Sequence, residues 1–113
     1  MEDIYEVKVS EKIYDKILSG KCTYYIFVND RKRLSYKEGN ILTLKNENNT
    51  LKVEIVNMLY FTTVKELLDM VGKEKCGFTS SQNVDIIEDY YYNNYNAADI
   101  DKFGLVAVQF KVK

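Results

Sequence analysis

The chain contains no histidine, no proline and no tryptophan, and it has only two cysteines. Without histidine, serine–histidine and cysteine–histidine catalysis are excluded, as are histidine general bases. The side chains that could still move a proton are carboxylates, lysine, cysteine and tyrosine. A tetrahedral zinc site would have to combine Cys22 and Cys76 with carboxylates, which is uncommon. We therefore expect two free thiols packed as small apolar groups, and no metal or cofactor.

Long apolar segments are also missing. No apolar run approaches the ~20 residues that a membrane span needs. The acidic N-terminus, residues 1–10, lacks the apolar segment of a secretory signal. These features predict a cytoplasmic protein with no membrane partner. A length of 113 residues and a hydrophobic fraction of 46% indicate a single globular domain over residues 1–113.

Charge is nearly balanced but unevenly distributed. A net charge of −1 does not indicate a protein that coats nucleic acid through bulk positive charge. However, the segment from Lys21 to Lys37 contains five basic residues and one acidic residue, Asp30. Residues 85–101 contain five acidic residues and no basic residue. The sequence therefore predicts one positive and one negative face.

Periodicity and capping signals divide the chain into alternating elements. Ser10 is a good N-cap for a helix that Gly20 ends, Thr62 or Thr63 caps a second helix, and Ser80 or Ser81 opens a third. This third helix is expected to fray near residues 95–96. The first two expected helices cover residues 11–19 and 64–71, and the third runs from Ser80 or Ser81 to about residue 95. The expected strands cover residues 4–9, 23–28, 41–44, 51–61 and 104–112.

The order of these elements predicts the fold class. Strands and helices mix without regular alternation, which favours an α+β fold over a doubly wound sheet. Five strands with hairpin connections and a returning C-terminal strand indicate a small, barrel-like mixed sheet flanked by two or three helices.

The strand over residues 23–28 is rich in aromatic side chains. Tyr25 and Phe27 share one face, because side chains alternate along a strand, while Tyr24 lies on the other. Tyr25 could stack on a nucleic-acid base or pack beneath a helix, and Phe27 could stack or belong to the core. The following loop carries Arg31, Lys32 and Arg33, which could contact phosphates or remain solvated.

Four tyrosines cluster in the third predicted helix. Adjacent helical residues point about 100° apart, so Tyr90, Tyr91 and Tyr92 cannot all be core. Tyr91 and Tyr95 share a face at a spacing of four residues. We expect one or two of the four to pack on the sheet, and the others to be exposed. Exposed tyrosines suit a protein partner or a homodimer contact.

Several motifs follow one another at a characteristic spacing. Ser19-Gly20-Lys21 ends a helix before a strand, and Lys37-Glu38-Gly39-Asn40 forms the turn before the next strand. A helix at residues 62–68, a Tyr-rich helix at 87–92 and a closing strand at 103–108 come later. In order and spacing these motifs resemble the ASCH domain, a branch of the PUA-like superfamily, and the likeness covers nearly the whole chain.

The resemblance implies a PUA-like mixed β-barrel with flanking helices and a cleft beside the strand that follows Gly20. It also implies binding of RNA or nucleotides, and some bacterial ASCH domains hydrolyse an acylated cytidine nucleoside. The family pattern around this strand is G-x-K-T-x-E-x-R. Here Thr23 is retained, whereas Cys22, Tyr25 and Phe27 occupy the Lys, acid and Arg positions.

Three hypotheses follow from these observations. The first is a domain that binds RNA or a nucleotide-like ligand, without most of the family's catalytic residues, through Lys21, Tyr25, Arg31, Lys32 and Arg33. The second is an amidohydrolase acting on an acylated cytidine nucleoside, with Lys21, Thr23 and Glu74 as candidate catalytic residues. The third is a protein-interaction module that uses Tyr90, Tyr91, Tyr92 and Tyr95.

Overall fold

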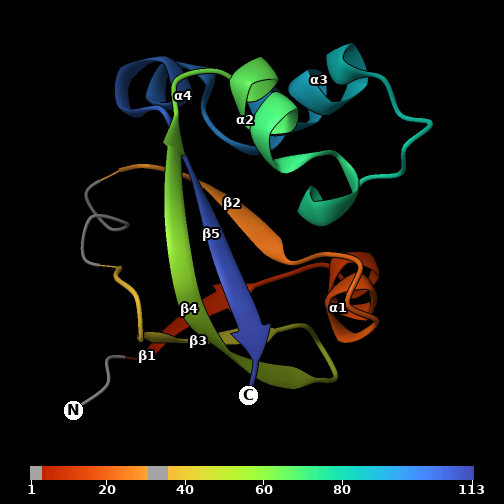
Figure 1. Cartoon of the computed structure of the whole chain (residues 1–113), viewed down its shortest axis with the longest axis vertical. Coiled ribbons are helices and arrows are strands. Elements are labelled where there is room, and N and C mark those ends of the chain that lie inside the picture. The colour runs from red at the N-terminus through yellow and green to blue at the C-terminus, as the bar shows by residue number, and fades with distance from the viewer. Residues whose placement is uncertain (1–3, 31–35) are drawn as a thin grey trace.

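The computed structural model describes residues 4–30 and 36–113. This part of the chain forms five strands, four α-helices and one 3-10 helix (Figure 1). In chain order the elements are β1 (Ile4–Lys8), α1 (Glu11–Leu18), β2 (Tyr24–Val28), β3 (Ile41–Lys45), β4 (Thr50–Phe61), α2 (Val64–Val71), the 3-10 helix η2 (Glu74–Cys76), α3 (Val84–Asn94), α4 (Ala97–Phe103) and β5 (Leu105–Val112). The predicted α+β class is therefore confirmed, with one helix more than expected.

Side-chain caps begin the first two helices at predicted positions. The Ser10 hydroxyl accepts a hydrogen bond from the N–H of Ile13 at 3.2 Å, and the Thr63 hydroxyl accepts one from the N–H of Glu66 at 3.2 Å. Each bond pairs an N–H group that the first helical turn leaves without a partner. Of the two threonines considered, Thr63 is therefore the cap.

The third helix begins later than predicted. Neither Ser80 nor Ser81 is its cap, because the side-chain oxygen of Asn83 accepts the N–H of Ile86 at 2.9 Å. The helix ends near residues 95–96, as predicted, with Tyr95 as its C-cap. Asn96 then caps α4, a short helix that the sequence did not predict.

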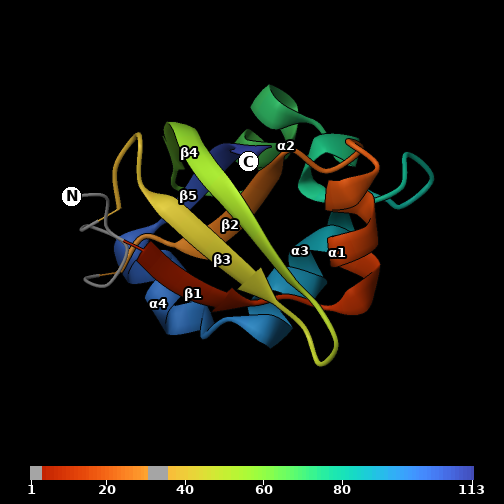
Figure 2. The same cartoon turned by 90° about the horizontal axis from the view of Figure 1, so that it is seen from below.

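The five strands form one mixed sheet in the order β1-β3-β4-β5-β2. β1 runs parallel to β3, and the other neighbouring pairs are antiparallel. Seen from below, Figure 2 shows β1, β3 and β4 side by side, with β5 and β2 behind them. The sheet curls into a half-barrel, so β1 and β2, which lie at opposite ends of the strand order, come to border a common opening.

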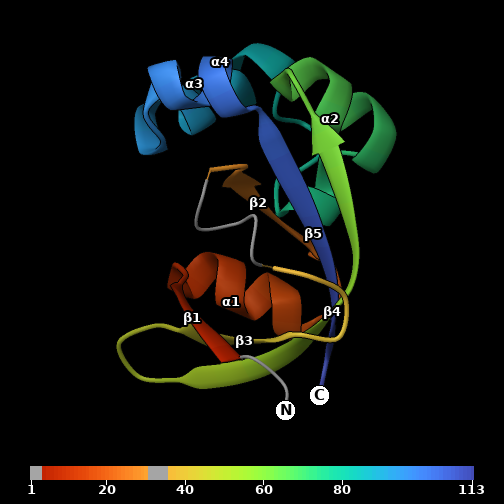
Figure 3. The ribbon, with the colours of Figure 1, turned by 90° about the vertical axis from the view of Figure 1, so that its left-hand side faces the viewer.

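Two apolar clusters pack on the two faces of this sheet. One holds Phe27 and the buried side of α1, including Ile17, and the other holds Ile26 together with residues of α2, α3 and α4. The predicted alternation along β2 is thus confirmed. Figure 3 shows the matching arrangement, with α2, α3 and α4 gathered at one end of the molecule and α1 apart from them.

Candidate functional site

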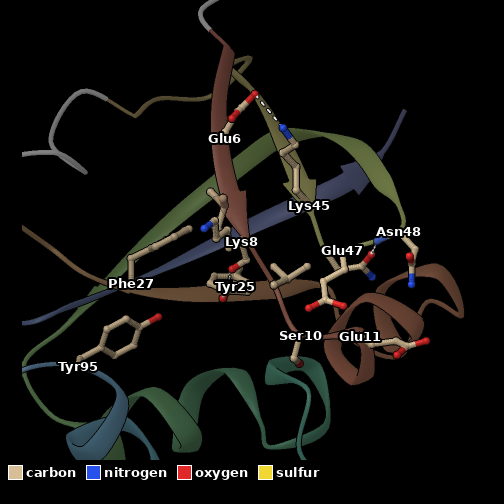
Figure 4. Close-up of a pocket in the computed structure, with 13 residues that line it drawn as sticks. Glu6, Lys8, Ser10, Glu11, Tyr25, Phe27, Lys45, Glu47, Asn48 and Tyr95 are labelled. Atoms are coloured by element: carbon tan, nitrogen blue, oxygen red, sulfur yellow. Dashed lines mark hydrogen bonds and ion pairs between the residues drawn. The ribbon is translucent and has the colours of Figure 1, made fainter.

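A pocket of about 1020 Å³ lies between the two edge strands of the half-barrel. One wall comes from β1 and the residues that follow it, the other from β2 and Tyr95 (Figure 4). The turn between β3 and β4 closes one end. The lining residues are Glu6, Val7, Lys8, Val9, Ser10, Glu11, Tyr25, Phe27, Lys45, Asn46, Glu47, Asn48 and Tyr95.

Three aromatic side chains form the β2 side of the pocket. The rings of Tyr25 and Phe27 lie 4.9 Å apart and are inclined by 42°. Phe27 is fully buried, which confirms its core role, while half-buried Tyr25 presents its ring to the pocket. Tyr95 approaches from the end of α3, and its hydroxyl donates a hydrogen bond to the carbonyl of Ile26. This wall offers flat apolar surface with polar edges.

The Tyr25 hydroxyl also reaches across the opening. It lies 3.5 Å from the main-chain carbonyl oxygen of Lys8, at the outer limit of a hydrogen bond. This contact connects the two edge strands at one point. Phe27 and Glu6 border the opening further along.

Charges around the pocket are mixed. The lining contains the carboxylates of Glu6, Glu11 and Glu47 and the ammonium groups of Lys8 and Lys45. Lys45 is paired with Glu6 at 3.4 Å, so part of the positive charge is already compensated. The described lining is therefore unsuited to concentrate several phosphates, and it suits a ligand portion that carries no charge.

The two cysteines lie outside this pocket and behave as apolar groups. Both are buried and free, as predicted. Burial raises the pKa of the Cys22 thiol from 9.0 to about 11. Burial, together with the nearby Cys22 thiol, raises the pKa of Cys76 to about 12. Because the thiolate is the nucleophile, neither side chain is prepared for covalent catalysis at neutral pH.

The three candidate catalytic residues lie near the junction of β2 and η2. The Thr23 N–H donates to the Lys75 carbonyl at 3.0 Å, which holds the start of β2 against this short helix. Lys21 and Glu74 are exposed. None of the three belongs to the described lining of the pocket. Arg31, Lys32 and Arg33 lie outside the described residues.

The tyrosine cluster divides between core, surface and pocket. Tyr91 is buried, and burial raises the pKa of its phenol well above the ordinary value of 10. Tyr90 is exposed and Tyr92 is half-buried. Tyr95 is the pocket residue that the sequence analysis assigned to a different role. The spacing of four residues between Tyr91 and Tyr95 predicted that both lie on the same face of the helix. The spacing alone could not show that Tyr95 reaches the edge of β2.

Two negative findings apply to the described residues. No group of three or more Cys, Asp or Glu side chains within residues 4–30 and 36–113 could hold a metal ion. No helix in this same portion is long and apolar enough to cross a membrane.

Two solved structures share this architecture. The crystal structure of the hypothetical protein PH0355 matches with a TM-score of 0.87 and 23% sequence identity, covering 97% of this chain and 99% of that one. The solution NMR structure of protein PF0455 from Pyrococcus furiosus matches with a TM-score of 0.79 and 20% identity, covering 96% of each chain. The likeness is one of fold. No family model matches the sequence, and no curated protein matches it.

Proposed function

We propose that this chain is an ASCH-like, PUA-like domain that binds RNA or a nucleotide-like ligand in the pocket between β1 and β2. The observation that carries the proposal is the aromatic wall of Tyr25, Phe27 and Tyr95 beside an opening of about 1020 Å³. Bases stack on aromatic rings whatever their sequence, and half-buried Tyr25 borders the space of the pocket.

The division of charge supports a base in the pocket and phosphates elsewhere. Three carboxylates and two ammonium groups line the described walls, so a phosphate would meet repulsion there. Lys21, one of the basic residues predicted to contact phosphate, is not part of this described lining. Both observations are consistent with an RNA strand that inserts one base into the pocket and keeps its phosphate backbone outside.

Anisotropy of a fluorescently labelled single-stranded RNA tests the proposal. Replacing Tyr25 with Leu keeps apolar bulk but removes the ring. Since stacking on one side chain contributes roughly 1–3 kcal/mol per base, affinity should fall by about 5- to 150-fold. Tyr60→Leu is the matched control, because Tyr60 is an exposed tyrosine outside this pocket. Equal affinities for wild type and folded Tyr25→Leu would contradict the proposal.

The amidohydrolase alternative has weaker support. Its candidate residues, Lys21, Thr23 and Glu74, lie outside the pocket lining, and Cys22 has a raised pKa. Acyl transfer needs a proton carrier and an oxyanion donor beside the bound substrate. On the β2 side, the described lining supplies neither a lysine nor a carboxylate, and Lys45 on the other side of the pocket is already paired with Glu6.

A further inference from the structure

The hydrogen-bond register of β1 determines where its main-chain groups point. In a parallel pair, alternate residues of a strand direct both N–H and C=O to the neighbouring strand. The Val9 N–H donates to the Lys45 carbonyl at 2.9 Å, and Lys8 lies opposite Lys45. Odd-numbered residues of β1 therefore bond to β3, while Glu6 and Lys8 direct their main-chain groups away from the sheet.

These outward groups face the pocket. The Lys8 carbonyl is the one that the Tyr25 hydroxyl approaches from β2. Glu6, two residues earlier, lines the same pocket. Within residues 4–30 and 36–113, no hydrogen bond is made to the outward N–H or C=O of Glu6. An adjacent main-chain donor and acceptor thus remain available at the pocket wall.

On the opposite edge, β2, the outward carbonyl groups are occupied. Its odd-numbered residues bond to β5, as the N–H of Phe110 does with the Thr23 carbonyl, so the even-numbered carbonyls point outward. The Tyr24 carbonyl accepts the Cys22 thiol at 3.2 Å, and the Val28 carbonyl accepts the Asp30 N–H at 2.8 Å. The Ile26 carbonyl accepts the hydroxyl of Tyr95. All three outward carbonyls of β2 are therefore engaged, whereas among the described residues the outward carbonyl of Glu6 on β1 has no such partner.

We infer that the main-chain N–H and C=O of Glu6 determine which ligand the pocket accepts. They select an uncharged heterocyclic base that carries a hydrogen-bond donor and an acceptor side by side on one edge. One residue of an edge strand offers the complementary pair in one plane, as it would to another strand. The carboxylates among the pocket-lining residues would in addition repel a negatively charged ring. This inference rests on the proposed function and names the atoms that read the base.

Nucleosides with a blocked edge provide the first test. Uridine and guanosine are titrated into the 15N-labelled protein, and amide shifts are followed by NMR, beside 3-methyluridine and 1-methylguanosine. Methylation removes the ring donor while leaving the stacking surface. We expect at least one parent nucleoside to bind about tenfold or more tightly than its methylated form, with the largest shifts at β1. Equal binding of both methylated forms and their parents would overturn the inference.

Two substitutions at one position provide the second test. Glu6→Pro removes the outward N–H and leaves the β1–β3 bonds, which use odd-numbered residues, in place. Glu6→Ala keeps the main chain and removes only the side chain that pairs with Lys45. The preference for the unmethylated nucleoside should survive Glu6→Ala and vanish in Glu6→Pro.

The outcomes separate this inference from the proposed function. A folded Glu6→Pro that retains the preference overturns the reading role of Glu6, while RNA binding lost in Tyr25→Leu still supports the stacking pocket. RNA binding without any nucleoside binding also overturns the reading role alone. If neither RNA nor nucleoside binds, the proposed function and this inference fail together. If Glu6→Pro does not fold, the comparison of methylated and unmethylated nucleosides on the wild-type protein still tests the inference.

Discussion

The buried thiols predict a loss of stability in alkaline solution. Burial raises the pKa of Cys22 from 9.0 to about 11 and that of Cys76 to about 12. A raised folded-state pKa means that the folded chain keeps its protons at a pH where the unfolded chain has lost them. Stability is therefore unaffected below pH 9 and falls as the pH rises through the interval from 9 to 12.

The magnitude follows from these values. At pH 10 an unfolded thiol with a pKa of 9.0 is about nine-tenths ionised, which stabilises the unfolded chain by roughly 1.4 kcal/mol per thiol. Both folded thiols remain mostly protonated at this pH. Together they should lower the free energy of unfolding by on the order of 3 kcal/mol between pH 7.5 and pH 10.

Urea unfolding followed by far-ultraviolet circular dichroism, with a reductant present, measures this effect. The reference is the double variant Cys22→Ala with Cys76→Ala, which loses packing at every pH but has no thiol to titrate. Lysines and tyrosines titrate in both proteins, so their contribution cancels in the comparison. The free energy of unfolding of wild type should fall about 3 kcal/mol further than that of the double variant. Parallel pH profiles would show that the folded thiols ionise normally and would refute the reasoning.

Two further predictions concern Tyr95, which lines the pocket, and Gly104, which directly precedes β5. Tyr95→Phe should lower the free energy of unfolding by roughly 1–3 kcal/mol, because the Ile26 carbonyl loses its donor, and an unchanged urea midpoint would contradict this. Gly104→Ala should destabilise more than Gly20→Ala. Both glycines have positive φ, of +77° and +81°, but only at Gly104 would a Cβ lie 2.8 Å from the carbonyl oxygen of Phe61. Similar unfolding free energies for the two alanine variants would show that the chain relaxes around Gly104.

Local signals were sufficient for most of the secondary structure. Ser10 and Thr63 make the cap bonds expected of them, and the alternation of Ile26 and Phe27 between two cores follows from the strand period alone. The missed helix, α4, buries only Ile100 in seven residues, so it carries almost no periodic apolar signal. Its start was still marked by Asn96, whose side chain accepts the N–H of Ala98 at 2.9 Å.

The pocket itself could be predicted only in part. The resemblance to the ASCH domain implied the cleft beside β2, and the alternation along that strand left Tyr25 either in the cleft or beneath a helix. The opposite wall was not expected, since the strand order that brings β1 to the other edge is set by pairing between distant segments. Tyr95 was missed for the same reason. Its hydroxyl reaches Ile26 across 69 positions of sequence.

The proposed recognition of a base depends on main-chain polar groups rather than on reactive side chains. Proton transfer needs particular side chains, whereas the β2 wall of the pocket supplies the rings of Tyr25 and Phe27. Hydrogen bonding to a base needs only a donor and an acceptor, which the outward main chain of Glu6 provides. Main-chain groups persist through every substitution except proline, whose absence from this sequence leaves each strand edge with its full set of N–H donors. On this proposal, recognition through β1 should be less sensitive to side-chain substitution than catalysis would be, and a change in backbone, such as Glu6→Pro, should remove it.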